Sequence, residues 1–97
     1  MRITYDPAKR DRTLRQHGLD FEQAPKVFVG LERTILDLLQ DYGEDRYVTY
    51  GHLHGRMVAI VWTPHDEDER RVISMRKCNA KEQARYRERL REVGRDE

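Results

Sequence analysis

The sequence has little of what a membrane-bound or disulfide-rich protein needs. It contains one cysteine in 97 residues, which excludes a disulfide framework and favours a cytosolic setting. No run of about 18 apolar residues occurs, so a transmembrane helix is excluded, and residues 1–6 lack the apolar core of a signal peptide. With 37% hydrophobic residues, we expect one modest core and a single domain spanning residues 1–97.

Charge is abundant but unevenly distributed. The chain is 38% charged with a net charge of +1, yet the balance is +2 over residues 1–33, −6 over 34–69 and +5 over 70–97. Most basic residues are arginine, whose planar guanidinium suits phosphate and carboxylate partners. The C-terminal block therefore indicates either an anion-binding surface or a solvated helical face laced with ion pairs. The acidic centre is its counterweight, within the chain or in another subunit.

The N-terminal third predicts a strand and two helices. Residues 2–5 alternate weakly, as a short strand does, and Asp6-Pro7 is a helix-start signal. This helix is expected on the surface and should end near His17, with Gly18 in the left-handed conformation. Asp20-x-x-Gln23 is a second capping signature. The helix that follows should start late or kink at Pro25, and its core-facing residues are Phe21, Ala24, Val27 and Phe28.

The remainder predicts four strands and a last helix. The strands are expected at residues 34–39, 46–53, 57–63 and 71–75, with a hairpin at His54-Gly55. Residues 57–62 are apolar on both faces, so this strand should be central and covered. Asp66–Glu69 is expected to be a solvated loop, and Asn79-x-x-Glu82 is a capping box that opens a helix over residues 80–93. The order β-α-α-β-β-β-β-α predicts an α+β fold with an antiparallel sheet and helices packed on it.

Two ordered sets of residues run through nearly the whole chain. The first set is Tyr5-Asp6-Pro7-Ala8-Lys9, Leu14, His17-Gly18, Phe21-Glu22 and Val27-Phe28. The second set is Glu44, Arg46, Gly51, Gly55-Arg56, Trp62-Thr63, Ile73-Ser74-x-Arg76, Glu82 and Tyr86. In this order and spacing the chain resembles the BrnT family of toxins from bacterial toxin–antitoxin systems.

The resemblance implies a RelE-like fold, an RNA-cleaving activity and an antitoxin partner. The antitoxin is expected to be of the BrnA type, with a ribbon-helix-helix DNA-binding part, and its dimerisation would give a two-plus-two complex. Several positions depart from the family pattern: Tyr5, Arg10, Thr13, Gln16, Pro25 and Met75. The family often has a lysine at position 16, so its absence weakens any phosphate contact from the first helix.

A ribonuclease of this kind needs no metal or other cofactor. RNA carries its own nucleophile, the 2′-OH, so the protein must deprotonate it, stabilise a phosphorane-like transition state and protonate the leaving oxygen. The candidate catalytic residues are Arg76, His17 and Tyr86. The candidate RNA-binding residues are Lys9, Arg46, Arg56 and Lys77.

Arg76 is the main candidate for a phosphate clamp. It is expected just past the last strand, before the helix capped by Asn79, where exposed backbone N–H groups favour an anion. The alternative is that Arg76 forms an ion pair with an acidic residue such as Glu82 or Glu44.

The other candidates each have a structural alternative. His17 suits acid–base chemistry but also suits a helix C-terminus. Tyr86 either stacks on a base or packs against the sheet, and Lys9 is either near the His17 site or simply solvated. Arg46 and Arg56 either line an RNA groove or neutralise the acidic centre. Arg85 and Arg89 suit a charged outer helix face or the docking of an acidic antitoxin segment.

Other motifs carry less. His52, His54 and His65 do not have metal-ligand spacing, and no metal site is expected. Cys78 precedes a helix start, where a thiolate is stabilised, but no neighbouring histidine supports a nucleophile. Besides the ribonuclease, two functions remain open: a non-catalytic RNA- or protein-binding module with the same fold and, with no helix-turn-helix signal to support it, a DNA-binding regulator.

Overall fold

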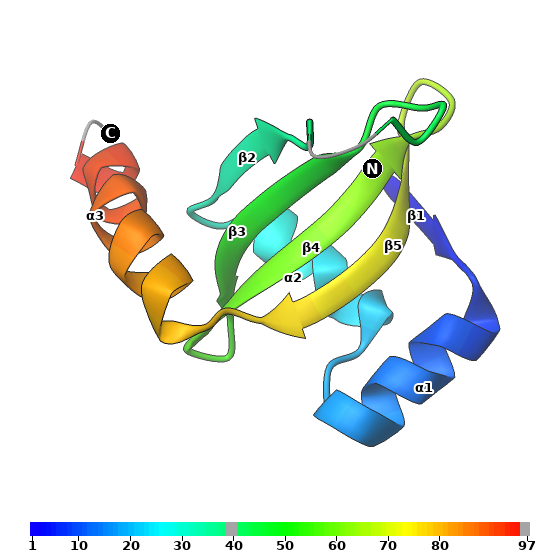
Figure 1. Cartoon of the computed structure of the whole chain (residues 1–97), viewed down its shortest axis with the longest axis horizontal. Helices are drawn as coiled ribbons and strands as arrows, with labels where there is room; N and C mark the ends of the chain where they lie inside the picture. Colours follow the sequence, from blue (N-terminus) through cyan, green and yellow to red (C-terminus); the bar gives the residue numbers. More distant parts are fainter. Residues whose placement is uncertain (39–40, 96–97) are drawn as a thin grey trace.

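The computed structural model describes residues 1–38 and 41–95, with side chains up to residue 89. The elements along the chain are β1 (Arg2–Tyr5), α1 (Pro7–His17), the 3-10 turn η1 (Phe21–Gln23), α2 (Ala24–Phe28), β2 (Arg33–Leu36), β3 (Tyr47–Leu53), β4 (Arg56–Pro64), β5 (Glu69–Lys77) and α3 (Ala80–Arg95). The α+β class is confirmed (Figure 1). The strand expected at residues 34–39 is shorter, and position 39 lies outside the described residues. None of the described helices is both long and apolar enough to cross a membrane.

The five-stranded sheet is mixed rather than antiparallel throughout. Its strand order is β1-β5-β4-β3-β2, and β2 to β5 form the expected antiparallel meander. The expectation is wrong at β1, which runs parallel to β5 with Arg2 opposite Glu69 and Tyr5 opposite Val72. Hairpins force neighbouring strands to be antiparallel, whereas no hairpin joins β1 to β5.

The central strand β4 is covered on both faces, as its composition predicts. On one face Val58, Ile60 and Trp62 belong to a core cluster with the residues of η1 and α2. The four residues expected to enter the core from this segment are all buried: Phe21, Ala24, Val27 and Phe28. The late helix start at Pro25 is also confirmed, because the 3-10 turn η1 precedes α2.

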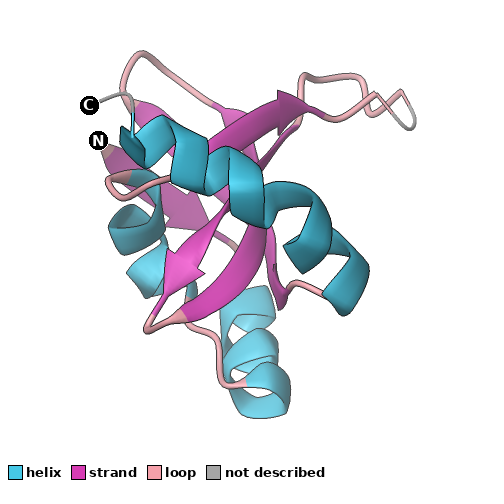
Figure 2. Ribbon diagram, turned by 90° about the vertical axis from the view of Figure 1, so that its left-hand side faces the viewer, coloured by secondary structure: helices cyan, strands magenta, loops and turns pink. Residues whose placement is uncertain are grey.

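Helix α3 covers the opposite face of the sheet (Figure 2). Tyr86 packs there against Tyr50, Met57 and Ala59, with Cys78 completing the cluster. The capping box at the start of α3 is formed: Glu82 N–H donates to Asn79 Oδ1 at 2.8 Å, and Asn79 N–H donates to Glu82 Oε1 at 3.1 Å. Local capping chemistry therefore sets the point where the chain turns from β5 to lie back across the sheet.

Helix α1 is peripheral, and an ion pair links it to the start of η1. It has no buried residue; Asp6 accepts from Ala8 N–H at its start, and Gly18 ends it at φ 68°. Arg10 donates to both carboxylate oxygens of Asp20, at 2.8 and 3.0 Å. Asp20 also accepts from Glu22 N–H, so one carboxylate both caps η1 and holds α1.

The acidic run Asp66–Glu69 is not a solvated loop throughout. Glu69 is the first residue of β5 and is buried, with 8% of its surface exposed. Its carboxylate accepts hydrogen bonds from Arg2 and Thr4 of the neighbouring β1, and His65 Nδ1 lies 3.0 Å away. The hydrogen bond from Arg2 is the main cause that lowers the pKa of Glu69. The expectation was wrong for Glu69 because Arg2 and Thr4 of β1 donate hydrogen bonds that stabilise the buried carboxylate.

We expect Gly51→Ala to destabilise the fold by about 1–3 kcal/mol, because overpacking strains a buried site. A Cβ at Gly51 would lie 2.7 Å from Cγ1 of the buried Val27. Val27→Ala should then cost less in the Gly51→Ala background than in the parent, as urea unfolding would measure. Gly30→Ala is the control, since its Cβ would meet nothing closer than 3.5 Å. Strictly additive costs would contradict the close contact.

Candidate active site

Arg76 is held at the surface of the sheet by a two-pronged ion pair. Its Nη1 and Nη2 donate to the two carboxylate oxygens of Glu82, each at 2.7 Å. Arg76 lies within β5, opposite Ala59 on β4, and not past the end of the strand as expected. β5 runs on to Lys77 because β4 continues to offer it a pairing partner. The alternative that Arg76 pairs with Glu82 is therefore what the structure contains.

The ion pair leaves Arg76 able to meet a second anion. The contact with Glu82 uses one N–H of Nη1 and one N–H of Nη2. A guanidinium has five N–H groups, so three of them, including the one on Nε, do not take part in this contact. The Arg76 side chain is 50% exposed, whereas Glu82 is 16% exposed. The hydrogen bond from Arg76 is the first cause that lowers the pKa of Glu82. Glu82 thus stays ionised and orients a cation that still faces solvent.

Two stacked tyrosines lie beside this ion pair. The rings of Tyr50 on β3 and Tyr86 on α3 are 3.9 Å apart between centroids and tilted by 16°. Both residues are buried. Burial, followed by a hydrogen bond with Tyr86, raises the pKa of Tyr50 to about 12. Its hydroxyl therefore stays protonated at neutral pH and can donate a proton or a hydrogen bond.

Of the two alternatives for Tyr86, core packing is observed. One face of its ring meets Tyr50, and the guanidinium carbon of Arg89 lies 5.9 Å from the ring centroid. Stacking on an RNA base would require one of these neighbours to move.

These residues border a cavity of about 440 Å³ between β2 and α3. We call it the Arg76 groove. Its lining combines apolar residues of β2, β3 and β4 with charged and aromatic ones: Ile35, Leu36, Asp37, Leu38, Val48, Tyr50, Val61, Arg76, Arg85 and Tyr86. Arg85 adds a second cation, so the α3 side of the groove is suited to an anion.

Arg56 lies in a second basic pocket. This cavity of about 390 Å³ is lined by His52, Gly55, Arg56, Met57, Gln83 and Arg87. Gln83 and Arg87 come from α3, as do Arg85 and Tyr86 of the Arg76 groove, so the two cavities lie along the same helix. An extended anionic chain could contact both.

The structure does not bring the remaining candidates into the groove. His17 and Lys9 are on α1, which lies beside η1 on the far side of the molecule from α3 (Figures 1 and 2). Lys77 pairs with Val58, so it faces the side of the sheet opposite Arg76. Arg46 donates to Glu44 at 3.2 Å and stacks 4.0 Å from the Tyr42 ring, at the end of β3 opposite the hairpin. It thus partly neutralises the acidic centre, as the alternative for Arg46 predicts.

Neither the cysteine nor the histidines form a second reactive centre. Cys78 is buried, and burial is the first cause that raises the pKa of its thiol to about 11, so it is not a nucleophile at neutral pH. His52 lines the Arg56 pocket, whereas His65 lies at the β1–β5 end beside Glu69. The histidines singled out in the sequence therefore do not converge.

Sequence reasoning missed Tyr50 and assigned Arg85 only to a charged helix face or to antitoxin docking. Tyr50 lies two residues after Val48 on β3, so it shares the face that α3 covers. Arg85 is three residues after Glu82 on α3 and so lies on the same side of the helix. Both signals were present in the spacing, but the facing element was not known.

The fold and the groove define a small α+β protein with a surface groove that Arg76 and Arg85 line. Comparison with known families gives the particular class: residues 5–82 match the family described as the ribonuclease toxin, BrnT, of type II toxin–antitoxin systems. The chain belongs to the BrnT family of ribonuclease toxins.

A solved structure agrees with this assignment. The chain is similar to the Brucella abortus ribonuclease toxin BrnT, whose crystal structure was determined at 1.1 Å, with 27% identity and a TM-score of 0.63. The similarity covers 81% of this chain and 97% of the Brucella chain. A comparison with curated protein sequences gave no match.

The ion pair makes a prediction about pH. Because Arg76 holds the folded-state pKa of Glu82 below its ordinary value of 4.5, the pair stabilises the fold above that value and its contribution is lost as pH falls through the lowered pKa. Glu82→Gln keeps a residue suited to the capping box but removes the charge. We expect the stability difference between parent and variant to be large at about pH 7 and to shrink toward about pH 3, in urea unfolding at each pH. A difference that is constant with pH would contradict the ion pair.

Proposed function

We propose that this toxin is a metal-independent endoribonuclease that cleaves RNA through attack of the 2′-OH. The observation that carries the proposal is the half-exposed guanidinium of Arg76, which Glu82 orients in a groove that Tyr50 and Tyr86 also line. Membership of a ribonuclease toxin family supports RNA as the substrate. The sheet covered by helices on both faces is consistent with the RelE-like superfamily that the sequence resemblance implies.

The chemistry follows from where charge develops. As the 2′-OH attacks the phosphorus, its proton passes to solvent water and the bond to the 5′ oxygen breaks. Negative charge builds on the non-bridging oxygens, and the Arg76 guanidinium can donate hydrogen bonds to them. The protonated hydroxyl of Tyr50 can deliver a proton to the leaving 5′ oxygen, and Tyr86 is proposed to position that hydroxyl. The ionised Glu82 serves as a positioning residue for Arg76, since its lowered pKa makes it a weak base.

Binding of the RNA chain is assigned to the basic residues of the two cavities beside α3. Arg85 in the groove and Arg56 in the second pocket would hold phosphates on either side of the cleaved one. Lys9, Arg46 and Lys77 remain proposed RNA contacts outside the groove, and His17 remains a proposed acid or base only if RNA also reaches α1. The runner-up function is a non-catalytic RNA- or protein-binding module.

The partner implied by a type II system is an antitoxin. We propose that it is a ribbon-helix-helix protein of the BrnA type that forms a two-plus-two complex in the cytoplasm and blocks access to the Arg76 groove. The basic face of α3 supports an electrostatic part of that interface.

An oligoribonucleotide with a single 2′-deoxy substitution tests the mechanism. We expect the parent RNA to be cut in the presence of EDTA to give a 2′,3′-cyclic phosphate end, since no metal takes part. The deoxy position should not be cut, because it has no nucleophile. Mass spectrometry of the products reads both outcomes. RNA binding without any cleavage would favour the non-catalytic module, and cleavage at the deoxy position would contradict 2′-OH attack.

Substitution of Arg76 tests the site. Arg76→Ala should lower the cleavage rate by about 10²-fold or more while the protein stays folded, and Arg76→Lys should restore it only in part, because lysine cannot form the planar fork. Arg12→Ala on α1, an exposed arginine far from the groove, is the matched control and should cleave normally.

His17→Ala is the companion variant. We expect an unchanged rate per folded molecule, because α1 lies far from the groove. If the pH–rate profile of this variant instead lost a limb near neutrality, His17 would belong to the reaction. Should Arg76→Ala cleave as fast as the parent, the Arg76 groove is not the active site.

A further inference from the structure

The exposed large apolar side chains gather in one stretch of the chain. Among the described residues seven such side chains are exposed, and five of them lie between positions 29 and 38: Val29, Leu31, Ile35, Leu36 and Leu38. Val29 and Leu38 are each 81% exposed. Isolated apolar residues on a surface are ordinary, but Ile35, Leu36 and Leu38 line one cavity and so lie close together, as at a place where another molecule binds.

This stretch contains an open sheet edge. β2 is the last strand in the order β1-β5-β4-β3-β2, and β3 is its neighbour on one side. The other side presents backbone N–H and C=O groups to any added strand. Edge strands are commonly protected by charged side chains, proline or a bulge. The sequence of β2 is Arg-Thr-Ile-Leu, so its only protecting residue is the arginine at its start.

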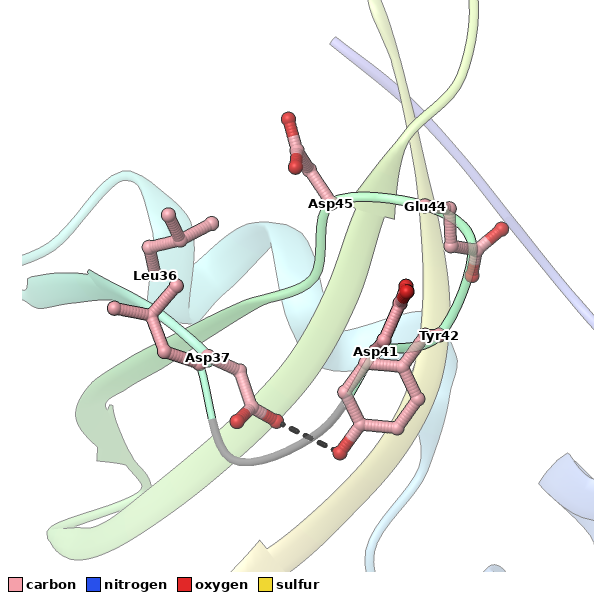
Figure 3. A pocket seen from close by; sticks show the side chains of 7 residues that line it. Leu36, Asp37, Asp41, Tyr42, Glu44 and Asp45 are labelled. Atoms are coloured by element: carbon pink, nitrogen blue, oxygen red, sulfur yellow. Dashed lines mark hydrogen bonds between the residues drawn. The ribbon is translucent and has the colours of Figure 1, made fainter.

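A strongly acidic pocket follows the end of β2. Its volume is about 320 Å³, and it is lined by Leu36, Asp37, Leu38, Asp41, Tyr42, Glu44 and Asp45. Figure 3 shows Tyr42 pointing its hydroxyl at Asp37, at 3.2 Å. Asp41, Glu44 and Asp45 add their carboxylates to that of Asp37, and Arg46 contacts Glu44. The pocket therefore complements a basic side chain.

The apolar edge also borders the Arg76 groove. Ile35, Leu36 and Leu38 line that groove, and Leu36 and Leu38 line the acidic pocket as well. A chain lying along β2 would thus place side chains over the mouth of the groove. A molecule that binds along β2 would therefore also block access to the Arg76 groove.

A second copy of the toxin fits this edge poorly. An antiparallel pairing that matches all four residues of β2 with the same four residues of another copy would set Glu32 opposite Asp37 at each end. Like charges directly opposite each other are destabilising in such a pair. The edge is therefore better suited to a chain with a different charge pattern.

We propose that the β2 edge, residues 29–38, is the docking surface of the antitoxin. An extended apolar segment of the antitoxin adds as a strand to β2, and a lysine or arginine at one end of that segment enters the acidic pocket. Neutralisation results because the bound segment covers Arg76 and Arg85. The identity of the partner rests on the proposed function, whereas the position of the surface rests on the exposed apolar residues and the acidic pocket.

Charge insertion into the edge tests the apolar part. The full-length cognate antitoxin is titrated calorimetrically into the full chain and into Leu36→Lys and Leu31→Lys. We expect each variant to weaken binding by about tenfold or more, because a lysine cannot be buried without a partner. Leu14→Lys on α1 is the matched control, because Leu14 is 39% exposed and Leu36 is 42% exposed. The affinity of the Leu14→Lys variant for the antitoxin should stay within about twofold of the parent's. Unchanged affinity of both edge variants would overturn the proposal.

Charge reversal tests the acidic pocket. Asp45→Lys should weaken antitoxin binding and reduce its salt dependence between about 0.05 and about 0.5 M NaCl, whereas Glu67→Lys in the β4–β5 turn should change neither. Equal effects of the two reversals would remove the acidic pocket from the interface.

Two further readouts identify the occupant. Sedimentation of the chain alone would reveal a dimer, and a dimer dissolved by Leu36→Lys with antitoxin affinity unchanged would assign the edge to a second copy. Leu31 lies outside the groove, so Leu31→Lys should still cleave RNA. Lost cleavage with unchanged antitoxin affinity would assign the edge to RNA.

The proposed activity can fail separately. If the parent chain cuts no RNA yet binds antitoxin through Leu31 and Leu36, the ribonuclease proposal is wrong and the docking surface stands. If the parent cuts RNA and the antitoxin binds both edge variants as tightly as the parent, the docking surface is wrong and the activity stands.

Discussion

A central strand that is apolar on both faces constrains the rest of this fold. Because Val58 and Ile60 point one way and Met57 and Ala59 the other, β4 requires a layer on each side. The segment of η1 and α2 provides one layer. α3 provides the other, and its placement sets Tyr86 on Tyr50 and Glu82 beside Arg76. The candidate active site is thus a consequence of covering the second face.

The Arg76–Glu82 pair joins structure and chemistry in one contact. Glu82 closes the capping box of α3 and orients a guanidinium of β5, so the helix start and the strand are tied together. A fully buried pair of this kind would offer nothing to a substrate, and a fully exposed one would be mobile and weak. Here the carboxylate is mostly covered and the guanidinium half exposed, so the cation is oriented and still reaches solvent.

The two sides of the groove carry opposite properties. One side is lined by Arg76, Arg85 and two tyrosines, and the β2 side by exposed apolar residues together with Asp37. A protein partner could therefore bind the apolar side of the groove and exclude RNA without being negatively charged itself. An inhibitor bound along β2 would owe its affinity to apolar burial and backbone hydrogen bonds, while RNA affinity would depend on salt.

Several features could be predicted from the sequence because they depend on residues close together in the chain. Asp6 and Gly18 bound α1, the Asn79–Glu82 box starts α3, and the doubly apolar β4 is central. Caps act within one helical turn, and strand patterning repeats every two residues. The family resemblance likewise rests on spacing along the chain. By contrast, the parallel β1, the burial of Glu69 between Arg2 and Thr4, and the distance of His17 from Arg76 depended on which segments meet across the sheet. Only the tertiary structure decides these, because each needs a partner more than fifty residues away or a choice between two faces that local sequence leaves equal.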